Sequence, residues 1–179
     1  MIYLYLKQPN IMSYCLSVQK LPENHVSRFY HDHVYGVPME DDSLLFERLV
    51  MEINQAGLSW VTILKKQENF KKAFDDYDLE KMAHYGEDKI DELLQNEGII
   101  RNQLKIRAVI HNAKVVLQLI EKYGSFKAWL DVHHPAELQD WIKLFKKTFK
   151  FTGPEIVREF LVSLAYLPCA HDEFCHLKK

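Results

Sequence analysis

Glu52 is a carboxylate residue at a position where the sequence predicts an apolar helix face. It lies three residues after Leu49, seven after Leu45 and four before Ala56, so these side chains share one face of a helix. An ionised carboxylate that is buried without a partner costs several kcal/mol of folding free energy. Glu52 is therefore either one half of a structural salt bridge to an arginine or a group held ready for a ligand.

His171 and Cys175 are four residues apart near the C-terminus, so one helical turn would bring both side chains to one ligand. A tetrahedral zinc ion needs two further nitrogen or sulfur donors. The upstream candidates are Cys15 and one of His25, His31 and His33. Such a set would hold the N-terminal segment against the C-terminal tail. The chain contains nine histidines, so a His-x3-Cys spacing can also arise by chance.

Three aromatic residues and one glycine turn could contact a larger ligand. Tyr30, Tyr35 and Trp60 stand at the ends of predicted elements, where they could hold a flat ring, although aromatic residues at such spacings also fill cores. The segment 98–101, Gly-Ile-Ile-Arg, separates two predicted helices. A turn of this kind exposes backbone N–H groups that can bind a phosphate, but it is also common in all-α proteins that bind no nucleic acid.

Length and composition favour a single all-α domain. The chain has 179 residues, of which 47% are hydrophobic and 27% charged, as is ordinary for a folded domain. Only six glycines and six prolines are present, without runs of alternating β-branched residues, which argues against a sandwich or barrel. The three cysteines, Cys15, Cys169 and Cys175, are too few and odd in number for a disulfide framework.

The N-terminal residues and the lengths of the apolar runs indicate the cellular location of the protein. No apolar run approaches the roughly 18 residues that a membrane span needs. The first ten residues have neither the basic start nor the apolar stretch of a signal peptide. We therefore expect a cytoplasmic protein that makes no membrane contact.

Caps and glycines predict seven or eight helices with no separable linker. Asp42 is expected to cap a helix that ends at Gly57, and Ser59 to cap the next helix, over 60–74. Further helices are expected at 79–85, 87–96, from about 102 to 123, 136–147 and, with Pro154 as first residue, to about 166.

Charge is distributed unevenly along these helices. Residues 71–97 carry four lysines against nine acidic residues, a charge of −5, whereas 98–122 and 141–158 each carry five basic residues against one glutamate, a charge of +4. The net charge of −2 excludes a protein that coats nucleic acid by charge alone. The two basic segments together would still form a face for DNA phosphates, unless they are ordinary solvated surfaces.

Five segments carry a longer and more specific pattern. They are FYHDHVYGVP at 29–38, MEINQAGLSWVTILKKQENFKKAF at 51–74, GIIRNQLKIRAVIHNAK at 98–114, FKFTG at 149–153 and HDEFC at 171–175. In this order they resemble the DNA-3-methyladenine glycosylase I family, most specifically in QAGLSW and the lysine-rich helix after it. The resemblance extends from about Cys15 to Cys175, with a weak stretch over 127–147.

The resemblance implies an all-α helix-hairpin-helix DNA glycosylase fold. It implies one domain, 1–179, of two intimate helical lobes with the hairpin at about 87–114. It also implies a structural zinc that joins the N- and C-terminal segments, and the matching ligands are Cys15, His31, His171 and Cys175. The implied partner is damaged double-stranded DNA, and we expect the protein to be a monomer.

The resemblance further assigns the base and DNA contacts. Glu52 matches the base-recognition glutamate and is the candidate catalytic residue, since the family is thought to use no dedicated nucleophile. Tyr30 and Trp60 match the aromatic residues of the base pocket, and Tyr35 stands where the family has a tryptophan. The expected DNA contacts are Leu58, which would fill the gap left by the flipped nucleotide, Gly98, Ile99 and Arg101 of the hairpin, and Lys146 of the second basic segment.

The implied activity is hydrolysis of the N-glycosidic bond of 3-methyladenine in alkylated DNA by a monofunctional glycosylase. A cationic base already has a weak glycosidic bond, so the enzyme mainly extracts the base and stabilises separating charges. The segment between Ser125 and Phe149 is shorter than expected in the family, and Gln103 and Thr148 replace the usual arginine and glycine. The alternative is therefore a DNA or modified-base binding module that keeps the fold without turnover.

Overall fold

The computed structural model describes residues 13–168 and 170–177, and their regular structure is helical throughout. Cys169 lies outside the described residues. The elements in chain order are α1 (Tyr14–Gln19), α2 (Val26–His33), α3 (Asp42–Gln55), α4 (Trp60–Ala73), the short 3-10 helix η2 (Asp75–Tyr77), α5 (Leu79–Ala83), α6 (Glu87–Gln95), α7 (Gln103–Tyr123), α8 (Phe126–Val132), α9 (Leu138–Thr148) and α10 (Pro154–Ser163).

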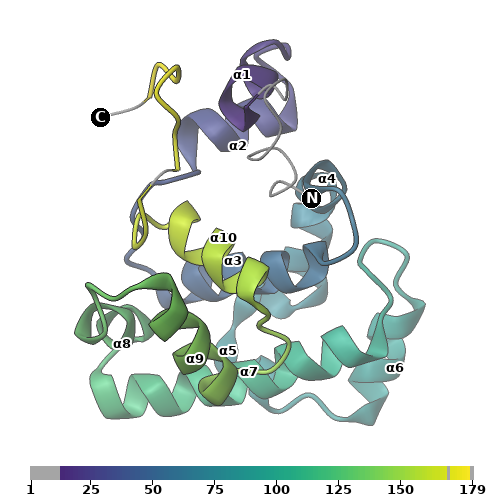
Figure 1. Cartoon of the computed structure of the whole chain (residues 1–179). Helices are drawn as coiled ribbons and strands as arrows, with labels where there is room; N and C mark the ends of the chain where they lie inside the picture. The colour runs from purple at the N-terminus through teal and green to yellow at the C-terminus, as the bar shows by residue number, and fades with distance from the viewer. Residues whose placement is uncertain (1–12, 169, 178–179) are drawn as a thin grey trace.

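Helix α3 forms the centre of the molecule. It packs against α4, α7, α8 and α10, and Figure 1 shows α3 beside α10 with α7 running below them. We expected a single apolar face on this helix, and that expectation is too narrow, because every residue from Leu45 to Asn54 is buried. Burial on all sides encloses Glu47, Arg48 and Glu52 together with the apolar residues.

The caps of α3 and α4 explain where both helices begin and end. Asp41, rather than the expected Asp42, caps α3, and its carboxylate accepts from the backbone N–H of Leu44 at 2.9 Å. Ser59 caps α4 as predicted. Between the two helices Gly57 has a φ of +86°, a conformation that glycine adopts at little cost. The tight link places Trp60 directly after the end of α3.

Helices α1 and α2 were not predicted from the sequence. Together with the C-terminal tail they lie at one end of the molecule, above α3 and α10 in Figure 1. At the other end of the chain's helical part, α10 stops at Ser163 rather than near residue 166, because Ala165 has a φ of +64° and interrupts the helix. Helix α10 thus ends where the chain turns toward α1 and α2.

The link between α6 and α7 contains the turn at Gly98. The side chain of Asn96 accepts a hydrogen bond from the Gly98 backbone N–H at 2.8 Å, and Lys66 on α4 donates to the Gly98 carbonyl at 3.1 Å. A Cβ atom at Gly98 would lie 2.9 Å from the Asn96 side-chain oxygen and 3.1 Å from Asn69 Cβ, so a larger residue would displace the oxygen that accepts from the Gly98 N–H. Asn102 then caps α7.

Across residues 13–168 and 170–177, no helix combines the length and the hydropathy that crossing a membrane requires.

Candidate functional site

Glu52 lies at the centre of the candidate site. It is 5% exposed, and it projects from the buried stretch of α3 between Leu45 and Asn54. Burial, followed by the negative charge of Glu159, raises the pKa of Glu52 to about 8, while Arg48 acts in the opposite direction. At neutral pH this carboxyl group holds a proton for much of the time.

Arg48 stands one turn before Glu52 on α3, but it interacts with a tyrosine. Its guanidinium donates a hydrogen bond to the Tyr30 hydroxyl at 2.5 Å and lies 4.8 Å from the centre of the Tyr30 ring. Within the described parts of the chain, no Lys or Arg side chain reaches the Glu52 carboxylate within 4 Å. Among residues 13–168 and 170–177, the structural salt bridge that the sequence left open for Glu52 is therefore not formed.

The three predicted aromatic residues form one cluster beside these charges. The Tyr30 ring packs edge-on against the Trp60 ring with centroids 5.1 Å apart, and it lies 5.8 Å from the Tyr35 ring. All three side chains are buried. The Trp60 indole N–H is also buried and has no hydrogen-bond partner among the described residues. A buried donor without an acceptor is uncommon, and a ligand could supply that acceptor.

Sequence reasoning missed three members of this cluster. Arg48 could have been found as Glu52 was, because it is also a charged residue within the apolar sequence of this helix. Glu159 lies three residues after Ile156 and three before Val162, so it also falls on an apolar face. Tyr14 gave no signal, because α1 was not expected, yet its hydroxyl is buried without a partner among the described residues.

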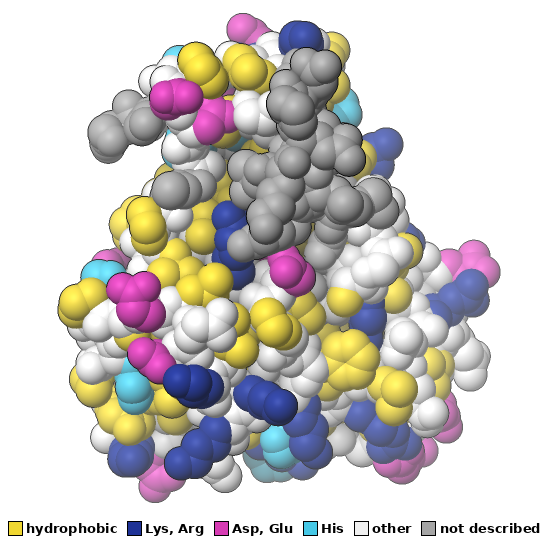
Figure 2. Space-filling model, viewed as in Figure 1, with side chains coloured by type: hydrophobic (Ala, Val, Ile, Leu, Met, Phe, Trp, Pro, Cys, Tyr) yellow, Lys and Arg dark blue, Asp and Glu magenta, His cyan; other side chains and the backbone are white. Residues whose placement is uncertain are grey.

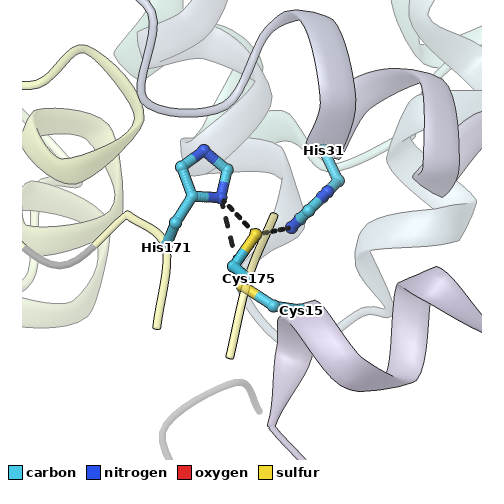
Figure 3. A group of neighbouring side chains, drawn as sticks. All are labelled: Cys15, His31, His171 and Cys175. Atoms are coloured by element: carbon cyan, nitrogen blue, oxygen red, sulfur yellow. Dashed lines mark hydrogen bonds between the residues drawn. The ribbon is translucent and has the colours of Figure 1, made fainter. Parts of the chain in front are cut away.

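Cys15, His31, His171 and Cys175 form a second cluster, and their ligand atoms all lie within 4.8 Å of one another. Figure 3 shows the four side chains directed toward one point. The Cys175 sulfur is 3.4 Å from His171 Nδ1 and 3.6 Å from His31 Nε2. Tetrahedral zinc bonds of about 2.3 Å to sulfur and 2.0–2.1 Å to nitrogen require sulfur–nitrogen separations of about 3.5 Å. The cluster thus has the dimensions of a metal site.

Outer hydrogen bonds orient both imidazole rings in this cluster. Asp32 lies 2.6 Å from His31 Nδ1, and the Tyr35 carbonyl lies 3.1 Å from His171 Nε2. If these acceptors receive the ring protons, the opposite nitrogens are left free to bind a metal. Burial lowers the pKa of His171, which favours the neutral form that ligates metals. The His25 and His33 alternatives lie outside this group.

The predicted DNA-contact residues differ in how far they are exposed. Leu58 is half-buried in the link before α4, and Arg101 is exposed next to the hairpin, 3.6 Å from Glu97. Lys146 is exposed on α9. Ile99 is 4% exposed, so its side chain belongs to the core, and its backbone N–H donates to the Asn96 carbonyl at 3.4 Å.

The basic face is smaller than the sequence predicted. Lysine and arginine side chains gather along the lower edge of Figure 2, where Figure 1 shows α7 and α9. Lys105, however, is 5% exposed and donates to the carbonyls of Asn54 and Ala56 at 2.9 and 2.8 Å. Arg107 forms a two-point ion pair with Glu87. The first basic segment therefore offers fewer free charges than its sum of +4 indicates.

The FKFTG segment opens a groove between α9 and α10. This groove has a volume of about 680 Å³, and its lining includes Lys146, Phe149, Phe151 and Thr152. Phe151 has a φ of +63° and is 42% exposed. An exposed phenylalanine beside a lysine gives this groove both an apolar and a cationic wall.

Comparison with known proteins gives matches over most of the chain. The family model for methyladenine glycosylase matches residues 20–141. DNA-3-methyladenine glycosylase 1 of Escherichia coli (strain K12) is 36% identical over 151 residues, which are 74% of this chain and 81% of that protein. DNA-3-methyladenine glycosylase of Haemophilus influenzae is 41% identical over 114 residues, 62% of this chain and 61% of that protein.

A solved structure of 3-methyladenine DNA glycosylase I from Staphylococcus aureus superposes with a TM-score of 0.77 at 32% sequence identity. The match covers 87% of this chain and 92% of that one, so it extends beyond the residues of the family-model match. The all-helical architecture, the extent of the family match and the identity to the E. coli protein agree. This chain belongs to the methyladenine glycosylase family.

Proposed function

We propose that this protein removes 3-methyladenine from alkylated double-stranded DNA by hydrolysing the N-glycosidic bond. The observation that carries the proposal is Glu52, a buried carboxylate that forms no ion pair with a described Lys or Arg, beside the ring pair of Tyr30 and Trp60. The chain is also similar to proteins named for this activity, and one similar structure is described as the structural basis of 3-methyladenine recognition.

The chemistry of the base suits these residues. A 3-methylated adenine in DNA is positively charged, so its glycosidic bond breaks with the bonding electrons moving to the base, and water then adds to the sugar carbon. Glu52 recognises the base by accepting a hydrogen bond from the exocyclic amine. The faces of Trp60 and Tyr30 attract the cation, an effect of up to about 2 kcal/mol in a desolvated site. Tyr35 completes the aromatic wall.

Unmodified adenine gains less from this site. It is neutral, so it lacks the attraction to the carboxylate and the rings, and its glycosidic bond is stronger. Glu52 therefore contributes by attracting the positively charged leaving base, and no nucleophile on the protein is required.

Zinc fits the cluster of Cys15, His31, His171 and Cys175. Two sulfur and two nitrogen donors at tetrahedral separations are a complete ligand set, with no position left for substrate. In this proposal the bound ion is a clamp between α1, α2 and the C-terminal tail. Tyr14 lies on α1, Tyr30 on α2 and Tyr35 in the turn after α2, so the clamp supports the aromatic cluster without entering the reaction.

DNA binding follows the helix-hairpin-helix pattern in this proposal. The turn at Gly98 leads the chain into α7, and backbone N–H groups of the first turn of α7 bind a phosphate. Arg101 and Lys146 add charge, and Leu58 occupies the space of the extruded nucleotide. Extrusion of the base brings it to the buried cluster around Glu52, which no stacked base could reach.

Release of free bases from methylated duplex DNA, separated by chromatography, tests the function. The wild-type protein should release 3-methyladenine, and Glu52→Gln should release it at least about tenfold more slowly, because the carboxylate charge is lost. Glu47→Gln is the matched control: Glu47 is also buried on α3, but it accepts from Gln67 at 2.7 Å and lies outside the aromatic cluster.

Two outcomes would contradict the proposal. A wild-type protein that binds the methylated base and never releases it from DNA is a binding module. If Glu47→Gln and Glu52→Gln lower the release equally, the loss of activity reflects the fold rather than a role of Glu52 in base recognition.

A further inference from the structure

Glu159 is a second buried carboxylate that the proposed reaction does not use. It lies on α10, and the Tyr35 hydroxyl donates to its Oε2 atom at 3.3 Å. Tyr35 is in turn 5.8 Å from Tyr30, ring to ring, and Tyr30 is 5.1 Å from Trp60. One chain of contacts therefore connects Glu159 to the cluster proposed to hold the base.

Two acidic groups thus face this cluster from neighbouring helices. Glu52 projects from α3 and Glu159 from α10, and these helices pack against each other in the centre of Figure 1. The charge of Glu159 contributes to the raised pKa of Glu52, and it also raises the pKa of Tyr30 and Tyr35. Two carboxyl groups that interact in a buried site do not ionise independently.

The surrounding positive charges offset this pair only in part. Arg158 forms a short ion pair with Glu159, and Arg48 is directed to the Tyr30 hydroxyl. Burial nevertheless raises the pKa of Glu52 and of Glu159 above the ordinary value. The other titratable groups described around the pair are Tyr14, Tyr30 and Tyr35, whose pKa values burial raises, and the exposed Glu155 on the first turn of α10.

We propose that Glu159 is a specificity-determining residue: together with Glu52 it favours a positively charged purine over a neutral one, and it makes the binding of that purine release a proton. The proposal rests on the base-recognition role proposed for Glu52. A bound cation reduces the repulsion between the two carboxylates, so the second of them ionises when the cation binds. A neutral purine gives no such compensation.

A titration with two small ligands tests this proposal. The cationic probe is 3,9-dimethyladeninium, whose charge does not depend on pH, and the neutral probe is 9-methyladenine. Binding is followed by tryptophan fluorescence, because Trp60 lies in the cluster. From pH 6 to pH 8 the affinity of the wild-type protein for the cation should rise by up to about tenfold per pH unit, the slope of one released proton. The affinity for 9-methyladenine should not rise.

Three variants separate the charge of Glu159 from its packing. Glu159→Gln removes the charge, so the cation affinity should stop rising at a pH at least about one unit lower than in the wild-type protein. At pH 9 the preference for the cation over 9-methyladenine should be about tenfold smaller than in the wild-type protein. Glu159→Asp keeps the charge and should keep most of the preference. Glu155→Gln removes an exposed charge from the same helix and should behave as the wild-type protein.

Calorimetry of the wild-type protein in two buffers with different ionisation enthalpies gives the number of protons released, and it does not depend on any variant folding. A value near one at pH 7 supports the proposal, and a value near zero overturns it. An unchanged cation preference in a folded Glu159→Gln variant also overturns it. If the wild-type protein binds neither probe, the proposed function fails instead, so the two failures are distinguishable.

Discussion

The Arg48 guanidinium donates a hydrogen bond to the Tyr30 hydroxyl and lies over the Tyr30 ring, one helical turn from Glu52. This one contact fixes the tyrosine of the aromatic cluster and keeps the nearest cation away from a direct ion pair with the carboxylate. Arg48 still lowers the pKa of Glu52 through its charge. It therefore acts on Glu52 through its charge without forming an ion pair with the carboxylate.

Replacement of Arg48 should move the pH dependence of base binding upward. Arg48→Met keeps much of the side-chain volume but removes the charge, so the pKa of Glu52 should rise above about 8. Titration of 3,9-dimethyladeninium against pH measures this shift, and the affinity should level off at a higher pH than in the wild-type protein. An unchanged profile in a folded variant would show that Arg48 acts on Tyr30 alone.

Glu52 should make the fold less stable as the pH rises. Its pKa is about 8 in the folded protein against an ordinary value of 4.5, so between these values the native state holds a proton that the unfolded state has lost. Stability therefore falls as the pH rises from about 4.5 and is lowest above about 8. Each pKa unit corresponds to about 1.4 kcal/mol, so the whole effect is on the order of a few kcal/mol.

Glu52→Gln removes this dependence and gives the measurement. Compared with the wild-type protein, the variant should melt at nearly the same temperature at pH 5 and several degrees higher at pH 8.5, since 1 kcal/mol corresponds to about 2–4 °C in a chain of this size. Because the two proteins are compared at the same pH, the contributions of the other titrating groups to stability cancel. A variant that is less stable than the wild-type protein at pH 8.5 would contradict the assignment.

Metal removal should destabilise the end of the molecule formed by α1, α2 and the C-terminal tail. Elemental analysis should find about one zinc per chain in protein purified without chelator, and Cys175→Ala should lose it and melt at least about 5 °C lower. His33→Ala is the control, since His33 is exposed and lies outside the four-residue cluster. Absence of zinc from the wild-type protein, or an unchanged melting temperature for Cys175→Ala, would refute the clamp.

The local signals in the sequence predicted the central helices and the unusual carboxylate. Ser59, Gly57 and Asn102 act on their immediate neighbours in the chain, so the ends of α3, α4 and α7 follow from short segments. Glu52 was recognisable because a buried charge contradicts an apolar periodicity. These features depend on spacings of a few residues, which a single sequence contains.

The contacts between distant segments could not be predicted in the same way. The Tyr35 hydroxyl and Glu159 are 124 residues apart in the chain, and Lys105 reaches the end of α3 across about 50 residues. Lys105 in particular has the composition of a surface residue, and only the packing of α3 against α7 shows that it is buried. The charge sum of a segment therefore overestimated the basic face.

This difference between charge in the sequence and charge on the surface leads to a prediction about DNA binding. Each phosphate that a lysine or arginine contacts releases a counterion, so the affinity for duplex DNA should fall steeply with salt, by a slope of about −0.9 per contact in a double-logarithmic plot. Arg101→Glu and Lys146→Glu replace exposed charges and should each reduce the magnitude of this slope by about one or more.

Two lysines provide the controls for this experiment. Lys81→Glu reverses an exposed charge in the acidic segment, where Lys81 faces Asp78 at 3.2 Å, and the slope should not change.

Lys105→Met removes a buried charge that donates to two carbonyls at the end of α3. It should lower the melting temperature by several degrees, since buried hydrogen bonds to a charged group contribute about 1.5–3 kcal/mol each. Its salt slope should remain that of the wild-type protein, because Lys105 is too deeply buried to contact a phosphate. Equal slopes in all four variants would show that the face formed by α7 and α9 does not bind DNA, whereas a reduced slope in Lys105→Met alone would show that this lysine leaves α3 when DNA binds.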